Sequence, residues 1–165
     1  MKKYFKFALY FCVYIAIILL FAVMFIITTA DAEIIKPNNG IEPYQVVKIQ
    51  LRGLKNNDTP TVDSGIEQTW KFAHPNNKKY TGPYERFKKM IKGENFSILL
   101  NHFEHQIYKE YISDKIAIFE VTILDSDKKY YKIKWQVEKY LIDGPLKDCW
   151  LTTAVSQPKA IGSSI

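Results

Sequence analysis

Cysteine is scarce in this chain, which has two among its 165 residues, Cys12 and Cys149. Cys12 lies inside a long apolar segment and Cys149 lies near the C-terminus, so a membrane boundary would separate them. They cannot pair, and no disulfide framework supports the fold. Nothing beside Cys149 obviously supplies a base, so we expect it to be a small buried hydrophobic residue rather than a nucleophile.

The sequence also lacks the motifs of common catalytic and nucleotide-binding sites, with no G-x-S-x-G, no GxGxxG and no Walker loop. Histidine is rare, with three residues in all. His102 and His105, in "NHFEHQ", would share one face of a helix but point to opposite faces of the strand that we expect there. Zinc needs three or four ligands, and no Cys or carboxylate stands at supporting spacing. We therefore predict no metal ion and no cofactor.

Clusters of positive charge are short. The chain carries 23 Lys and Arg and 17 Asp and Glu, and residues 1–30 hold three of the lysines and no acid. The excess of basic over acidic residues in the rest of the chain is small. The stretches that come closest to forming a cluster of positive charge are "NNKK" and "ERFKKMIK". A nucleic-acid-binding domain usually collects its cations on one face or in one run. We therefore predict no nucleic-acid partner.

One long apolar segment is present at the N-terminus. Three lysines precede residues 8–27, "ALYFCVYIAIILLFAVMFII", which carry no charge. About 20 apolar residues are enough to span a bilayer, whereas a secretory signal has an apolar region of roughly 7–15 residues and a small-residue cleavage site. The sequence Ala-Asp-Ala at residues 30–32 fits such a site. Residues 1–32 are thus either an uncleaved membrane anchor or a signal peptide that is removed after Ala32.

Both alternatives predict the same topology, because the positive-inside rule keeps the N-terminal lysines in the cytoplasm. The rest of the chain would face the periplasm or the outside. It would be anchored in the membrane if the segment stays, and secreted or periplasmic if the segment is cleaved. Residues 33–42, "EIIKPNNGIE", combine Pro, Asn and Gly and are expected to form a linker.

Three short helices are predicted from the apolar periodicity that begins at Pro43. Asp63 or Ser64 would cap the second helix. Thr81 would cap the third, and Gly93 would end it. The recurring apolar positions are Tyr44, Val47, Leu51 and Leu54 in the first helix, Ile66, Trp70 and Ala73 in the second, and Phe87, Met90 and Ile91 in the third.

The stretch "HPNNKKYTG" lies between the second and third predicted helices. Pro75 and the two asparagines after it are expected to end the second helix and turn the chain. Lys78 and Lys79 would then lie near the start of the third helix. Because free backbone N–H groups at a helix start attract negative charge, these lysines are candidates for binding an anion.

From about residue 96 the composition turns to Ile, Val, Tyr, Trp and Thr, which favour strands. The segment "KYYKIKWQVEKYL" alternates between apolar and polar residues, with Tyr131, Ile133, Trp135 and Val137 on one face. Asp125-Ser126-Asp127 separates it from "KIAIFEVTIL" and indicates a hairpin. Further strands are expected near residues 102–111 and 147–155. Residues 159–165 are expected to be a frayed tail.

Helices that precede an antiparallel sheet are typical of the α+β class. We therefore predict three short helices packed on a curved antiparallel sheet of four to six strands, within one domain over residues 43–158. A chain of 165 residues is long enough for one such core and too short for two.

Several stretches resemble a known bacterial family. They are "VVKIQLRGLKNNDTP", "GIEQTWKFAHPNN", "TGPYERFKKM" and "LKDCWLTTAV", and the family is catalogued as domain of unknown function 4864. The similarity covers roughly Pro43 to Pro158. The family looks related to the cone-shaped fold of nuclear transport factor two and the ketosteroid isomerases. The resemblance implies a cone-like fold and adds a homodimer through the sheet as an expected partner, but it implies no activity.

Glu120 suggests one functional hypothesis, because it interrupts the apolar strand "IAIFEVTIL". In cone folds of this kind, a carboxylate in an apolar cavity can act as an acid or a base in an isomerase- or dehydratase-like enzyme. The side chains that would line such a pocket are His105, Tyr108, Tyr131 and Trp135. The alternative places Glu120 on the solvated face, opposite Lys132 or Lys134, as an ordinary cross-strand pair.

The second hypothesis is a non-catalytic module that binds a lipid, a small apolar molecule or another envelope protein. Its support is the aromatic content of 15% together with the predicted position outside the cytoplasm. A single acid without a placed partner is weak support for catalysis. We therefore expect a binding or structural module without evident catalysis.

Overall fold

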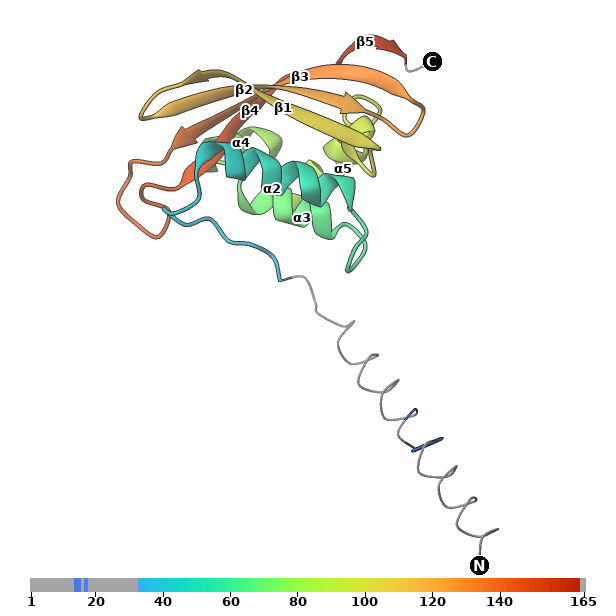
Figure 1. The fold of residues 1–165 in the computed structure, drawn as a ribbon. Coiled ribbons are helices and arrows are strands. Elements are labelled where there is room, and N and C mark those ends of the chain that lie inside the picture. Colours follow the sequence, from blue (N-terminus) through green and yellow to red (C-terminus); the bar gives the residue numbers. More distant parts are fainter. Residues whose placement is uncertain (1–13, 16, 18–32, 164–165) are drawn as a thin grey trace, which may run out of the picture. The chain divides into compact units, whose positions relative to one another are not determined.

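The structure, a computed structural model, describes residues 14, 15, 17 and 33–163, and element labels follow Figure 1. Contacts divide the chain into two compact units, residues 1–33 and 34–165. Most of the predicted anchor or signal segment, residues 8–27, and the cleavage site after Ala32 fall outside the described residues. Among the residues that are described, no helix is both long and apolar enough to cross a membrane.

Residues 33–163 form four α-helices and one antiparallel sheet of five strands, which confirms the predicted α+β class. The helices are α2 (Pro43–Lys55), α3 (Ser64–Lys71), α4 (Pro75–Thr81) and α5 (Tyr84–Lys92), followed by the short 3-10 helix η1 (Ser97–Leu99). The strands are β1 (Glu104–Ile112), β2 (Ile116–Leu124), β3 (Lys129–Lys139), β4 (Trp150–Val155) and β5 (Lys159–Ser163). Figure 1 shows the helices together on one side of the sheet.

Helix α2 starts as predicted, with Pro43 in its first turn. The backbone N–H of Glu42, just before the helix, donates to the side chain of Gln45 (3.2 Å). The fully buried apolar residues of α2 are Val46, Val47, Leu51 and Leu54. Helix α3 packs closely on α2, because a Cβ added to Gly65 would lie 2.0 Å from the carbonyl oxygen of Gly53. Only glycine at position 65 allows the two backbones to approach this closely.

Helix α4 was missed by the sequence interpretation, which assigned Pro75 and the two asparagines after it to a turn between two helices. Pro75 begins this helix instead of ending the previous one, since proline is well tolerated in a first turn. The imidazole of His74 caps it by accepting from the N–H of Asn76 (3.0 Å). Thr81 is the last residue of α4 and donates to the carbonyl of Asn77 (3.0 Å), so its prediction as the cap of the third helix was wrong. The third predicted helix is α5, and Gly93 follows its end as expected.

The sheet has the order β1-β2-β3-β4, and every pair is antiparallel. The turn at Asp125 joins β2 to β3 as predicted, and the N–H of Lys129 donates to the Asp125 carboxylate (2.8 Å). Strand β5 also pairs with β3. It corrects the expectation of a frayed tail at residues 159–165. The reason is that β4 pairs only with residues 135–139 of β3, so β5 can pair with the backbone groups of residues 129–132.

The two faces of the sheet differ in burial, as the alternation in β2 and β3 predicts. Phe119, Val121 and Ile133 point toward the helices and are almost fully buried. Cys149, just before β4, is 2% exposed, and burial raises the pKa of its thiol, which agrees with its prediction as a buried hydrophobic residue. The core therefore lies between the helices and one face of the sheet.

Candidate ligand-binding cavity

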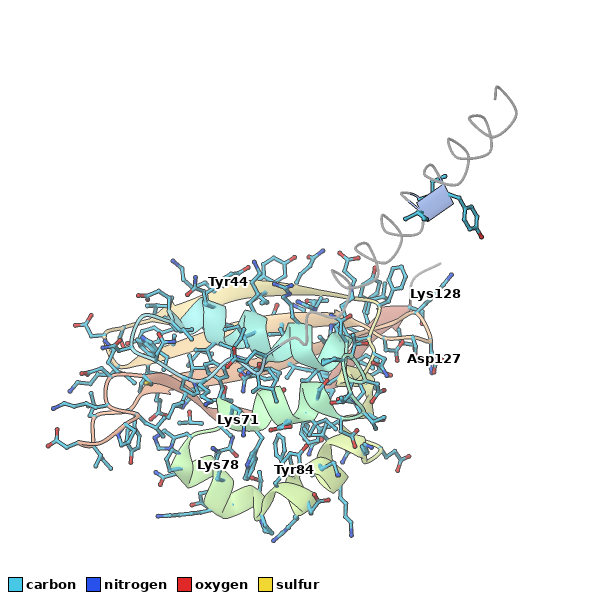
Figure 2. All side chains as sticks on the ribbon, turned by 90° about the horizontal axis from the view of Figure 1, so that it is seen from below. Tyr44, Lys71, Lys78, Tyr84, Asp127 and Lys128 are labelled. Atoms are coloured by element: carbon cyan, nitrogen blue, oxygen red, sulfur yellow. The ribbon has the colours of Figure 1, made fainter. Side chains whose placement is uncertain are left out.

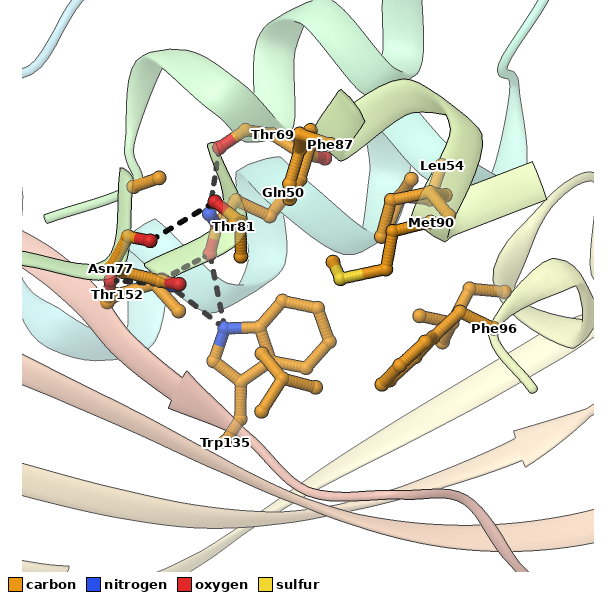
Figure 3. Close-up of a pocket in the computed structure, with 14 residues that line it drawn as sticks. Gln50, Leu54, Thr69, Asn77, Thr81, Phe87, Met90, Phe96, Trp135 and Thr152 are labelled. Atoms are coloured by element: carbon orange, nitrogen blue, oxygen red, sulfur yellow. Dashed lines mark hydrogen bonds between the residues drawn. The ribbon is translucent and has the colours of Figure 1, made fainter. Parts of the chain in front are cut away.

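A cavity of about 130 Å³ lies between the helices and the inner face of the sheet (Figure 3). Side chains of α2, α3, α4, α5, β3 and β4 and of the segments between them contribute to its wall. The lining residues are Gln50, Leu54, Thr69, Ala73, Asn77, Thr81, Phe87, Met90, Ile91, Phe96, Leu99, Trp135, Thr152 and Val155. Most of these side chains are apolar, and the polar ones gather at one end, as Figure 3 shows.

The polar end is built on a buried hydrogen-bonded triad of Gln50, Trp135 and Thr152. The Oε1 atom of Gln50 accepts from the indole Nε1 of Trp135 (3.1 Å) and from the hydroxyl of Thr152 (2.6 Å). Its Nε2 atom donates to the backbone carbonyl of Thr69 (3.1 Å). The indole Nε1 of Trp135 also donates to the hydroxyl oxygen of Thr152 (3.2 Å). Because α2 and β4 both hold the indole, the broad apolar side of Trp135 is fixed as a wall of the cavity.

Helix α4 forms part of the cavity mouth. The amide Nδ2 of Asn77 donates to the carbonyl of Thr152 (3.2 Å), which ties α4 to β4. Asn77, Thr81 and Met90 are partly exposed, whereas Gln50 and Trp135 are buried deeper in the cavity. A molecule entering from solvent would therefore first meet the amide of Asn77 and the hydroxyl of Thr81.

The side chains that line the cavity are apolar or carry neutral polar groups. Within the part of the chain that the structure describes, none of the 14 lining residues has an ionisable side chain. General acid or base catalysis requires a titratable group within hydrogen-bond reach of the substrate. The cavity supplies apolar contacts, amide groups and hydroxyls, which orient a molecule without changing its protonation.

Glu120 lies on the opposite face of the sheet from the cavity. Its neighbours Phe119 and Val121 point inward and are fully buried, so the alternation of a strand directs Glu120 outward. The carboxylate accepts from the ammonium of Lys132 (2.6 Å), and in register it lies opposite Lys134. The structure therefore agrees with the second of the two predictions for Glu120, a cross-strand ion pair on the solvated face. Glu120 does not line the cavity.

The four predicted pocket residues are not brought together. Trp135 lines the cavity. Tyr131 is on the same face of β3, four residues away, and does not line it. Tyr108 lies opposite Glu120 on the outer face and is 51% exposed. His105 packs beside His102 and does not line the cavity.

His102 and His105 form a close pair, which corrects the expectation that they point to opposite faces of one strand. Strand β1 begins only at Glu104, so His102 lies outside the alternation. Its Nε2 is 2.7 Å from Nδ1 of His105, and its Nδ1 donates to the carbonyl of Leu99 (2.7 Å). Burial lowers the pKa of His102 to about 4 and also lowers the pKa of His105. In the described residues no three His, Cys, Asp or Glu side chains come together as metal ligands.

Lys78 and Lys79 lie in the last turn of α4, which corrects the expectation that they lie near a helix start. The argument from free backbone N–H groups does not apply at that end, where carbonyl groups are exposed instead. The ammonium of Lys78 lies over the Trp70 ring, 5.1 Å from its centroid. Burial is the main cause that lowers the pKa of Lys78, followed by the nearby charge of Lys71.

Gln50 and Thr152 are site residues that sequence reasoning missed. A signal for Gln50 was present, since it lies four residues after Val46 and three after Val47 and so falls on the inward face of α2. Thr152 had no comparable signal, because threonine is common on either face of a strand. Its role depends on the pairing of β4 with β3, which a sequence does not specify.

Comparison with known proteins returned no matching family model, no matching curated protein and no matching solved structure. The resemblance to domain of unknown function 4864 and to cone-shaped folds stays a prediction.

Proposed function

We propose that this chain is a non-catalytic binding module that holds a small, mostly apolar molecule in the cavity lined by Trp135. The observation that supports it is an apolar cavity with a polar end and no ionisable lining residue. The predicted N-terminal segment would place this module outside the cytoplasm, on a membrane anchor or as a released protein. The enzyme hypothesis loses its main support, because Glu120 lies on the other face of the sheet.

The size of the cavity defines the class of molecule. An apolar cavity of about 150 Å³ is known to bind benzene, so 130 Å³ has room for one ring or a short alkyl chain. The polar groups at the mouth favour a ligand with one hydroxyl or carbonyl group, which Asn77 and Thr81 would contact. A charged ligand is disfavoured, since burying a charge without a partner is costly.

The three methionines of the chain offer a direct test, because Met90 lines the cavity and the other two, Met1 and Met24, belong to residues that the structure does not describe. The full-length protein is labelled with ¹³C in its methionine methyl groups and titrated with benzyl alcohol. We expect the Met90 signal to shift and saturate, while the other two change little or in proportion to concentration. Equal, non-saturating shifts at all three methionines would contradict the proposal.

Two variants of α4 make the test specific. Thr81→Trp places a large side chain at the cavity mouth, whereas Tyr80→Trp alters the neighbouring residue, which is 85% exposed. We expect the first variant to weaken benzyl alcohol binding at least about tenfold, because a blocked mouth removes the apolar contacts. The second variant should bind like the original protein. Unchanged binding in Thr81→Trp would show that the alcohol binds elsewhere.

A further inference from the structure

Positive charge is concentrated on one part of the helical layer. Residues 71–92, which run from the end of α3 to the end of α5, hold seven Lys and Arg residues and one acidic residue, Glu85. The other residues between 33 and 165 hold 13 basic and 15 acidic residues. The small net positive charge of residues 33–165 therefore comes from one strongly basic segment, while the remaining residues are slightly acidic.

Some of these cations are neutralised locally. Lys71 pairs with Glu67 (3.3 Å) and Lys92 pairs with Asp63 (2.7 Å). Lys88 lies 3.2 Å from Glu85 and 3.8 Å from Asp63. Among the described residues, no carboxylate lies within 4.0 Å of the remaining four, which are Lys78, Lys79, Arg86 and Lys89. Lys79, Arg86 and Lys89 are exposed, whereas Lys78 is half-buried with its ammonium over the Trp70 ring. We call the sides of α4 and α5 that carry these four residues the basic surface.

The four cations lie on adjoining helices. The Arg86 side chain lies over Gly82, the residue after α4, where an added Cβ would be 2.7 Å from Cδ of Arg86. Lys89 lies one turn further along α5, and Figure 2 shows both helices from below, the side away from the sheet. Tyr80 is 85% exposed on α4, beside Lys79. Exposed tyrosine next to lysine is typical of surfaces that meet lipid headgroups.

The chain upstream of the domain limits how far the start of the domain can lie from a membrane. Ile35 is fixed to α3 by two hydrogen bonds, from its N–H to Gln68 Oε1 and from Gln68 Nε2 to its carbonyl (both 2.8 Å). The predicted membrane segment ends at Ile27, eight residues earlier. Eight extended residues reach at most about 29 Å. If residues 8–27 stay in the bilayer, Ile35, where the chain joins the domain, remains within about this distance of the bilayer.

We propose that the basic surface rests on the anionic lipid headgroups of the membrane in which residues 8–27 are predicted to insert. Four cations without acidic partners are complementary to an anionic bilayer, and the short tether keeps their local concentration at that bilayer high. Thr81 and Met90, at the cavity mouth, belong to the same two helices. An apolar molecule that leaves the membrane would therefore meet the cavity near the headgroups.

The test compares two positions on the full-length protein in lipid vesicles. Single cysteines that carry a fluorophore are placed by Tyr80→Cys on the basic surface and by Tyr108→Cys on the outer face of the sheet, in a Cys12→Ser background. Cys149 is buried and reacts little. Quenching by lipids with a nitroxide on the headgroup reports proximity to the bilayer. With about 30% anionic lipid we expect position 80 to be quenched at least about twice as strongly as position 108.

Three changes test whether the contact between the basic surface and the bilayer is electrostatic: added salt, neutral lipid and removal of the basic side chains. Quenching at position 80 should fall to the level of position 108 in neutral vesicles and in about 0.5 M NaCl, where the Debye length is roughly 4 Å. It should also fall when Lys78, Lys79, Arg86 and Lys89 are all replaced by Gln. The matched control replaces Lys109, Lys115, Lys128 and Lys129 by Gln, which removes the same net charge from other exposed positions.

Three results would overturn the proposal. The first is equal quenching at positions 80 and 108. The second is stronger quenching at position 80 that does not respond to salt or lipid charge. The third is an equal loss in the control variant, which would indicate an effect of net charge alone. None of these results bears on benzyl alcohol binding in the cavity, so the two proposals are tested separately.

Discussion

The two faces of the sheet differ in burial and in the interactions that their side chains make. On the inner face, Phe119 and Trp135 are directly opposite each other in β2 and β3, and both are almost fully buried. On the outer face, one residue along, Glu120 pairs with Lys132 (2.6 Å), and both side chains keep 30% or more of their exposure. Burial of large apolar groups stabilises a fold by several kcal/mol per residue, whereas exposed ion pairs contribute about 0–1 kcal/mol. The inner face therefore carries the stability and the cavity.

Adjacent residues of β2 provide the strongest test of this comparison. We expect Phe119→Ala to lower the free energy of unfolding by about 3–5 kcal/mol, because it opens a cavity in a packed core. Glu120→Ala should lower it by less than about 1 kcal/mol, since it removes one partly exposed ion pair. Urea denaturation of the full-length variants measures both. Similar losses for the two variants would show that the outer face is covered by a partner in solution.

The buried histidine pair extends the comparison to pH. The pKa of His102 is lowered to about 4 by burial, and nearby Lys55 and His105 also disfavour its charge. The unfolded chain, with a histidine pKa near 6.5, binds the proton more readily, so stability is complete above pH 6.5 and is lost as pH falls toward 4. We expect this residue to account for about 3 kcal/mol of loss across that window.

His102→Gln removes the titrating group at this position and should make the urea midpoint clearly less dependent on pH between 6.5 and 4. The matched control is His74→Gln, at a partly exposed position before α4, which should retain most of the dependence. An unchanged pH profile in His102→Gln would mean that the acid sensitivity has another source.

The sequence predicted best those elements that are set by short-range patterns. The alternation in "KYYKIKWQVEKYL", the turn at Asp125 and the periodicity of α2 were sufficient for the α+β class and for the inward position of Trp135. Helix α4 was missed because it has no buried residue and so no apolar periodicity. Strand β5 was missed because it depends on an unpaired part of β3 rather than on its own residues.

The cavity was beyond prediction for a related reason. Its polar end joins Gln50 of α2 to Thr152 of β4, 102 positions apart in the chain, and no local pattern links them. Glu120 was a candidate catalytic residue because it is an acid within an apolar strand. In an antiparallel sheet with one solvated face, however, the outward-facing residues of a strand can be charged. The histidine pair was also missed, because its geometry depends on where β1 begins. The strand starts two residues later than expected, which leaves His102 outside it and brings the two rings together.

The smallest expected effect compares one substitution on both faces. Thr152→Val removes a hydroxyl that donates to Gln50 inside the core (2.6 Å). Thr122→Val changes a residue on the outer face of β2, opposite Lys132. The first should cost about 1 kcal/mol, because Gln50 loses one of two donors while Trp135 remains bonded to it. The second should stay within about 0.5 kcal/mol of the original protein.

The Thr152→Val variant also separates the roles of the polar triad. Because the indole stays hydrogen-bonded to Gln50, the cavity wall should keep its shape, and benzyl alcohol should still shift the Met90 methyl signal. A larger loss of stability together with lost binding would mean that the hydroxyl of Thr152, which also accepts from the indole N–H (3.2 Å), is needed to position Trp135. Equal changes in the free energy of unfolding in the two threonine variants would contradict the difference proposed between the two faces. The buried hydroxyl would then contribute no more to stability than the one on the outer face.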